Sequence, residues 1–207
     1  MESYSLVSNV ISKSLSKTQS KTQSLALNLI LVFTGVAFLA ALSQISVPFP
    51  GSPVPITGQT LGVLLIGSTY GFTLSNLTYL TYLISAFLGL PFFAGGGSGW
   101  KHIAGPTGGY LVGMWLASAV ISYLTTYFVK QKLKQKKFIN SIWFNTLFVL
   151  LVGEVVIFTL GVTWLKIYTG KNMGWALQFG FYPFLIGEFL KIAIATQSIS
   201  FISKKVR

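Results

Sequence analysis

Long apolar runs, separated by short polar or glycine- and proline-rich segments, make up most of the chain after residue 24. Not one charged side chain lies between Lys21 and Lys101, and a chain of 207 residues is too small to bury such a stretch as a soluble core. The longest runs have the length of membrane-spanning helices and cover residues 25–45, 107–129, 140–165 and the segment that begins at Pro183. The pattern therefore predicts an all-α membrane protein.

The composition agrees with this class, because 52% of the residues are hydrophobic, 9% are charged and the mean hydropathy is +0.69. Residues 1–24 are polar and basic and lack the pattern of a cleavable signal. We expect them to form a flexible tail before a substrate-binding membrane domain of residues 25–207. The sequence contains no cysteine, which excludes disulfides and thiolate metal sites.

The net charge of +12 would suit nucleic-acid binding, but the positions of the basic residues argue against it. Eleven of the 15 lie in three clusters at the edges of apolar runs: Lys13, Lys17 and Lys21; Lys130, Lys132, Lys134, Lys136 and Lys137; and Lys204, Lys205 and Arg207. Such clusters are typical of the cytoplasmic loops of a plasma-membrane protein and suit an anionic lipid surface. We expect contact with the lipid bilayer and not with nucleic acid, and both termini in the cytoplasm.

The same clusters predict the number of helices, since an even number of spans must separate two loops on one side of the membrane. The apolar run from Gln59 to Leu90 must then be two short helices with a break over residues 70–76, where Gly71 interrupts the pattern. This gives a bundle of six transmembrane helices. Its outer loops are expected at residues 46–58, 91–106 and 166–182.

Two of the expected outer loops have a special composition. Residues 46–58 contain four prolines, which favour a stiff, extended segment that could act as a lid. Residues 91–106 contain a run of glycines, which would let the backbone approach a ligand closely and donate N–H groups to it. A flexible connector would have the same composition, and both interpretations stay open.

Three ionisable residues lie within predicted helices, where a charge costs roughly 2.5 to 3.5 kcal/mol and usually has a partner or a task. Glu188 and Lys191 have i,i+3 spacing, so they share one helix face and can screen each other. They are expected near the outer surface, where they could line a pocket or form a purely structural ion pair. Glu154 could be a packed, neutral acid or a ligand-binding residue.

An enzyme is not expected from this sequence. Gly96-Gly97-Ser98-Gly99 matches the short pattern of intramembrane serine proteases, but the sole histidine, His102, follows in the same loop and not on a facing helix. A single histidine in a chain without cysteine also provides too few ligands for a metal site, so none is expected. A phosphate-binding GxxxxGK[ST] motif is absent, so any use of ATP would belong to partner subunits, and no cofactor is expected.

Several segments together carry a resemblance to a known family. They are Pro53-Val54-Pro55-Ile56-Thr57-Gly58-Gln59-Thr60-Leu61-Gly62-Val63-Leu64-Leu65, the glycine-rich segment 90–99, Gly105-Pro106-Thr107-Gly108-Gly109-Tyr110, Leu160-Gly161-Val162-Thr163-Trp164-Leu165 and Pro183-Phe184-Leu185-Ile186-Gly187-Glu188-Phe189-Leu190-Lys191. With these segments the chain resembles BioY, the biotin-specific S component of energy-coupling factor (ECF) transporters. In that family an aspartate usually occupies the position of Glu188.

The resemblance implies a biotin-binding membrane subunit that docks on a transmembrane coupling subunit driven by two ATPase subunits. Ala37 and Ala41 would form part of the docking face on the first helix. Phe92, Phe93 and Trp100 would join other aromatic residues around the apolar part of the ligand, and Lys191 would meet its carboxylate. The expected ligand-binding residues are Gln59, Gly97, Ser98, Tyr110, Trp164, Glu188 and Lys191. The alternatives are an S component for another small vitamin, a self-sufficient solute carrier and an intramembrane protease.

Overall fold

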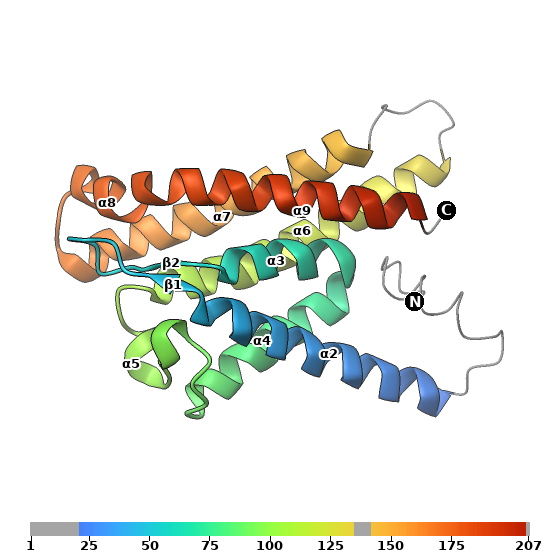
Figure 1. The fold of residues 1–207 in the computed structure, drawn as a ribbon, viewed down its shortest axis with the longest axis horizontal. Helices are drawn as coiled ribbons and strands as arrows, with labels where there is room; N and C mark the ends of the chain where they lie inside the picture. The colour runs from blue at the N-terminus through green and yellow to red at the C-terminus, as the bar shows by residue number, and fades with distance from the viewer. Residues whose placement is uncertain (1–20, 135–141, 206–207) are drawn as a thin grey trace.

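The computed structural model describes residues 21–134 and 142–205, and helices make up most of this part of the chain (Figure 1). The six longer helices are α2 (Lys21–Gln44), α3 (Gln59–Thr69), α4 (Phe72–Phe87), α6 (Gly108–Lys134), α7 (Ile142–Thr169) and α9 (Leu185–Lys205). The shorter elements are β1 (Ser46–Val47), β2 (Ile56–Thr57), the 3-10 turns η1 (Ala94–Gly96) and η2 (Tyr182–Phe184), and the helices α5 (Trp100–Ile103) and α8 (Met173–Gly180). The prediction of an all-α protein is confirmed.

The described residues contain four segments that are long and apolar enough to cross a membrane: 23–44, 108–129, 142–169 and 173–202. Many large apolar side chains on these helices are exposed, as expected where lipid covers a protein. The protein is therefore a multi-pass membrane protein. Helix α3 has 11 residues and a length of about 16 Å, about half the thickness of the hydrocarbon core, so the count of six complete spans stays a prediction.

The predicted break between two short helices is present but covers residues 70–71 and not 70–76. Helix α3 ends at Thr69, and α4 begins at Phe72. Gly71 between them has a φ of 76°, a left-handed conformation that glycine adopts without steric cost. The chain therefore turns back at this point.

The structure also corrects three expected boundaries. Helix α2 begins at Lys21, inside the segment expected to be a tail, while residues 1–20 lie outside the described residues. The expected loops 91–106 and 166–182 contain the helices α5 and α8. Helix α8 begins after Asn172, whose side-chain oxygen accepts a hydrogen bond of 2.8 Å from the Trp175 backbone N–H.

Helices α6 and α7 form the most extensive contact between two elements in the described chain, and glycines make it possible. A side chain at Gly109 would collide with Trp164, and one at Gly113 would lie 3.0 Å from the backbone of Ile157. On α7, a side chain at Gly161 would overlap the ring of Tyr110. Small residues at such positions let two helix backbones approach closely within a membrane.

The elements divide between the two ends of the molecule (Figure 1). The start of α2, the end of α6, the start of α7 and the end of α9 lie at one end. The elements β1, β2, α5 and α8 lie at the opposite end. Strands β1 and β2 pair in antiparallel register, with Ser46 opposite Thr57, so the proline-rich segment 48–55 connects the two strands of a short hairpin. The segment contains turns and is not extended throughout as expected, and its action as a lid stays a prediction.

Candidate ligand-binding site

A cavity of about 270 Å³ lies among the segments at the hairpin end of the molecule. This volume lies slightly below the range of roughly 300 to 1,000 Å³ that is usual for small-molecule sites, as suits a small ligand. The hairpin contributes Pro53, Val54, Pro55 and Thr57, while α3 contributes Gln59 and Thr60. The remaining walls come from Phe93 and Ala94, from Lys101 and His102, from Pro106, Thr107, Tyr110, Leu111 and Met114, from Ile157 and Phe158, and from Phe184 and Glu188.

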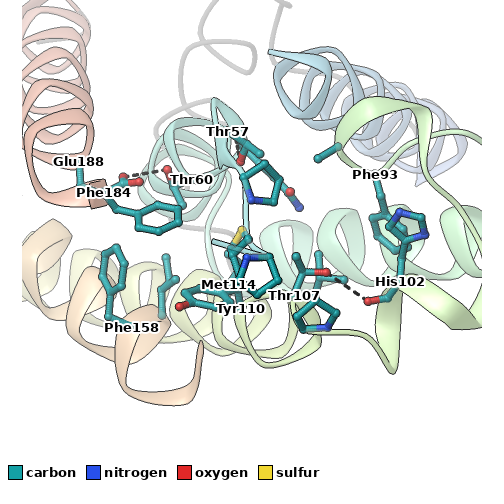
Figure 2. A pocket seen from close by; sticks show the side chains of 18 of the residues that line it. Thr57, Thr60, Phe93, His102, Thr107, Tyr110, Met114, Phe158, Phe184 and Glu188 are labelled. Atoms are coloured by element: carbon teal, nitrogen blue, oxygen red, sulfur yellow. Dashed lines mark hydrogen bonds between the residues drawn. The ribbon is translucent and has the colours of Figure 1, made fainter. Parts of the chain in front are cut away.

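Three aromatic rings from different elements form the apolar wall next to Glu188 (Figure 2). The ring centroid of Tyr110 lies 6.2 Å from that of Phe184 in a stacked arrangement and 6.3 Å from that of Phe158 in an edge-on arrangement. Phe158 and Phe184 are 6.0 Å apart. The Tyr110 hydroxyl donates a hydrogen bond of 2.7 Å to the Gly180 carbonyl, which fixes its ring. Such rings favour a flat, largely apolar ligand.

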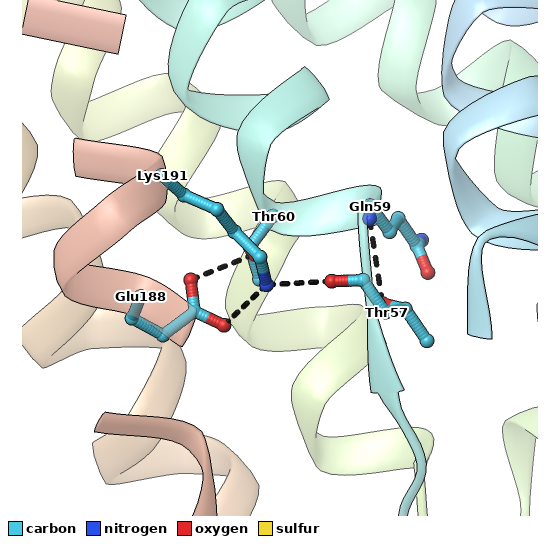
Figure 3. Close-up of polar contacts among 5 residues, drawn as sticks. All are labelled: Thr57, Gln59, Thr60, Glu188 and Lys191. Atoms are coloured by element: carbon cyan, nitrogen blue, oxygen red, sulfur yellow. Dashed lines mark hydrogen bonds and ion pairs between the residues drawn. The ribbon is translucent and has the colours of Figure 1, made fainter. Parts of the chain in front are cut away.

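Glu188 provides the polar part of this end of the cavity (Figure 3). Its Oε1 lies 2.7 Å from Lys191 Nζ, and its Oε2 accepts a hydrogen bond of 2.8 Å from Thr60 Oγ1. Glu188 is 4% exposed and lines the cavity. An ionised carboxylate can accept about four hydrogen bonds, so Glu188 retains capacity for N–H donors of a ligand.

Lys191 lies behind Glu188 and uses all three of its N–H groups within the protein (Figure 3). Besides Glu188 Oε1, its Nζ donates to the Thr57 carbonyl at 2.5 Å and to Thr60 Oγ1 at 2.9 Å. Lys191 does not belong to the residues that line the cavity. An ammonium group has three donors, so Lys191 in this arrangement holds Glu188, Thr60 and the start of α3 together.

Glu154 lies in the middle of α7, close enough to Glu188 and Lys191 for electrostatic interaction with both. It is 6% exposed, and neither of its carboxylate oxygens makes a well-formed hydrogen bond within the described part of the chain. Glu154 also lies outside the cavity wall. A buried polar group without a partner normally destabilises a fold, so its presence needs an explanation.

The opposite side of the cavity is formed by the glycine-rich segment and α5, where Figure 2 shows Phe93 and His102. His102 Nδ1 lies 3.1 Å from the Ser98 carbonyl, and since a carbonyl only accepts, Nδ1 carries the proton of this bond. The ring centroids of Phe93 and His102 are 5.8 Å apart. A side chain at Gly97 would collide with the His102 ring, so the imidazole packs directly on the loop backbone.

A sequence model of a family with the description BioY matches residues 13–207, which is nearly the whole chain. The chain belongs to the BioY family. Membership excludes the intramembrane-protease alternative, and the geometry agrees, because His102 contacts the Ser98 backbone carbonyl and no hydrogen bond joins it to the Ser98 hydroxyl in the described structure.

Relatives in the BioY family are similar over most of the chain. The chain is 32% identical to Biotin transporter BioY2 of Lactococcus lactis subsp. cremoris over 82% of this chain and 86% of that protein. It is 34% identical to a probable biotin transporter BioY of Pyrococcus horikoshii over 80% of this chain and 89% of that protein. The crystal structure of the S-component for biotin from an ECF-type ABC transporter has the same fold, with a TM-score of 0.76, 23% identity and coverage of 90% of this chain and 95% of that chain.

The structure brings together some of the site residues that the resemblance to BioY implied. Gln59, Tyr110 and Glu188 line the cavity, and Lys191 contacts Glu188 from behind. Gly97 and Ser98 contact His102 and lie outside the lining. Trp164 also lies outside it and donates a hydrogen bond of 2.8 Å to the Gly105 carbonyl. The ligand-binding roles of all these residues stay predictions.

Among the aromatic residues expected as walls, Phe93 lines the cavity, Phe92 does not, and Trp100 is 66% exposed at the surface. Sequence reasoning missed Thr60, Phe158, Phe184 and Lys101, all of which line the cavity. Thr60 and Phe184 lie within the BioY-like segments, so those segments could have drawn attention to them. Phe158 has no such signal, because an apolar residue within an apolar helix is usually a packing residue.

Proposed function

We propose that this protein is the biotin-binding S component of an ECF-type vitamin uptake transporter. It captures biotin from outside the cell and docks on a transmembrane coupling subunit that two ATPase subunits drive. The curated relatives are biotin transporters by name, and the structural neighbour is an S-component for biotin. Biotin is the transported ligand in this proposal, and the protein needs no cofactor of its own.

The observation that carries the proposal is the combination of an aromatic wall with a carboxylate of unused acceptor capacity in one cavity. Biotin has a flat ureido ring whose two N–H groups need acceptors, a thioether ring fused to it and an apolar tail that ends in a carboxylate. Glu188 can accept the ureido N–H groups, and Gln59 lies on the same wall with an amide that can donate or accept. Tyr110, Phe158 and Phe184 then cover the faces of the fused rings.

The arrangement of charges supports a cavity that faces outward. Lys21 lies at the start of α2, the Lys130–Lys137 cluster begins in the last turns of α6 and continues beyond it, and Lys204 and Lys205 lie at the end of α9. These helix ends lie together, opposite the end with the hairpin and α5 (Figure 1). Basic segments remain in the cytoplasm, so both termini are cytoplasmic in this proposal and the cavity opens outside.

The exposed face of α2 suits the proposed coupling subunit. Ala37 and Ala41 are both exposed and lie one helical turn apart, so they leave room for a helix of another chain to approach. In this proposal the coupling subunit covers this face during transport.

Equilibrium binding of biotin by the detergent-purified full-length chain tests the proposal. We expect saturable binding that excess riboflavin or thiamine does not reduce, because their larger or cationic rings do not match the aromatic wall and the Glu188 acceptor. Binding of a different vitamin with no binding of biotin would support the alternative of another vitamin S component. Binding of neither would refute the proposed function.

A further inference from the structure

The cavity has one cation on its wall that the protein itself leaves without a carboxylate partner. Lys101 lines the cavity from α5, beside His102, and its side chain is exposed. We propose that Lys101 binds the carboxylate of the ligand, so that the ureido ring lies at the Glu188 side and the tail points toward α5. This inference rests on the proposed function and assigns the orientation of biotin within it.

Lys101 is available for an external anion. The whole chain has three acidic residues, of which Glu188 is already paired with Lys191 and Glu154 lies in the middle of α7. Among the residues whose side chains the structure describes, the single salt bridge is the one between Glu188 and Lys191. A carboxylate that enters the cavity therefore meets a lysine whose charge no acidic side chain of the described chain neutralises.

Lys191 is the other candidate cation, and its surroundings do not suit an incoming carboxylate. Its three N–H groups are donated to Glu188, Thr60 and the Thr57 carbonyl, and it lies off the cavity wall. A ligand carboxylate could reach it only by breaking one of these bonds and lying next to the Glu188 carboxylate. Two carboxylates in contact repel each other strongly where water is scarce.

The position of Lys101 is fixed by contacts of the surrounding loop. The Gly99 N–H donates 2.8 Å to the Ala86 carbonyl at the end of α4, and the Trp100 ring packs edge-on against Phe87 with centroids 6.3 Å apart. His102 donates to the Ser98 carbonyl at 3.1 Å. These contacts on both sides hold α5 against the bundle, so Lys101 stays at the cavity wall.

The cavity wall between Glu188 and Lys101 is apolar and matches the thioether ring and the apolar tail of biotin. Leu111, Met114 and Ile157 line the cavity together with the Tyr110 ring. Figure 2 shows Tyr110 and Met114 between the Glu188 side and the His102 side. An apolar tail and a thioether bind well to such a surface, whereas a carboxylate would be desolvated there without compensation. Both polar ends of the ligand then meet a polar group.

The test compares biotin with its neutral carboxamide in equilibrium binding to the full-length protein. Wild-type protein should prefer the acid, and Lys101→Gln should lose most of that preference. We expect roughly a threefold to thirtyfold loss in biotin affinity, the range between an exposed ion pair and a desolvated charge-assisted bond, with carboxamide affinity unchanged. Lys101→Arg should retain the preference. Lys171→Gln is the matched control, an exposed lysine between α7 and α8 that lies outside the cavity wall and should bind like the wild type.

Failure of the inference can be distinguished from failure of the proposed function. An unchanged preference in Lys101→Gln that disappears in Lys191→Met would overturn the inference and leave biotin binding intact. The inference is also overturned if the wild type binds acid and carboxamide equally, or if Lys101→Gln weakens both ligands equally. Wild-type protein that binds neither ligand would instead refute the proposed function.

Discussion

At the scale of single residues, the polar network of Glu188, Lys191, Thr57 and Thr60 shows how the apolar helix α9 can contain two charged side chains. The i,i+3 spacing predicted that Glu188 and Lys191 screen each other, and the ion pair of 2.7 Å confirms it. Thr57 and Thr60 could not be predicted, because they lie 134 and 131 positions away from Lys191 in the sequence and only the packing of α9 on α3 brings them together. Local spacing predicts contacts within a helix but not contacts between helices.

Thr60→Val tests the importance of this network for binding. The valine has the same shape but loses the hydroxyl that donates to Glu188 and accepts from Lys191. Because hydrogen bonds to charged groups contribute about 1.5–3 kcal/mol, we expect lower thermal stability and about tenfold weaker biotin binding by titration. Thr78→Val is the control, since the buried Thr78 hydroxyl has no partner in the described structure and its loss should cost nothing. Equal effects of both variants would contradict a role of the network.

For Glu154 we expect the opposite effect of a substitution, namely higher stability with unchanged biotin binding. Both of its oxygens are buried without a well-formed hydrogen bond, and it lies off the cavity wall. Glu154→Met keeps a similar volume and removes an unsatisfied polar group, which should stabilise the protein by about 1–3 kcal/mol and raise its unfolding temperature in detergent. Biotin affinity should stay within about twofold, as for a change outside the site. A large loss of binding would instead show that Glu154 acts on the ligand site through Glu188.

At the scale of elements, the long helices and the turn at Gly71 could be predicted from local signals in the sequence. The length of an apolar run indicates a helix, and a glycine that interrupts the run indicates a turn. The helices α5 and α8 were not predicted, since four and eight residues are too few for a periodic pattern. A local signal for α8 was present, because asparagine before an apolar segment is a favoured helix N-cap and Asn172 has this role. The cavity could not be predicted, since its walls come from elements far apart in the sequence.

The contact between α6 and α7 sets the position of Tyr110, which Gly161→Ala tests. The added methyl group would overlap the Tyr110 ring, which packs on Phe158 and Phe184 and lines the cavity. Overpacking of this kind typically costs 1–3 kcal/mol, so we expect about tenfold or greater loss of biotin affinity and a lower unfolding temperature. Gly187→Ala on α9 is the control, because its added carbon would lie 3.8 Å from Ile56, an ordinary contact. Normal binding by the Gly161 variant would show that Tyr110 does not shape the site.

At the scale of the whole molecule, the separation of its two ends has a direct meaning for transport. The basic clusters lie at or next to the ends of α2, α6 and α9, and these helix ends lie together. The cavity lies among the elements at the opposite end (Figure 1). The sequence predicted this separation, since charge clusters at the edges of apolar runs are visible without a structure. Whether the cavity faces outward decides if the protein can capture a vitamin from the surroundings.

Cysteine accessibility in intact cells tests this orientation without background, because the chain has no cysteine of its own. A cysteine that replaces the exposed Lys171 between α7 and α8 should react with a membrane-impermeant maleimide. A cysteine that replaces Gln135, in the basic segment between α6 and α7, should react only after the cells are opened. The reverse pattern would place the cavity on the cytoplasmic side.

The hydrogen bond between Thr60 and Glu188 joins positions 128 residues apart, so it depends on parts of the chain that the ribosome makes far apart in time. Contacts between distant positions form late, because a long loop must close first. The cavity wall is complete only when Phe184 and Glu188, which lie just before and on the final helix α9, reach the earlier helices. A nascent chain that has not yet reached Glu188 therefore lacks the polar part of the cavity wall, and we expect it to bind biotin only after this segment has been made and has packed on α3.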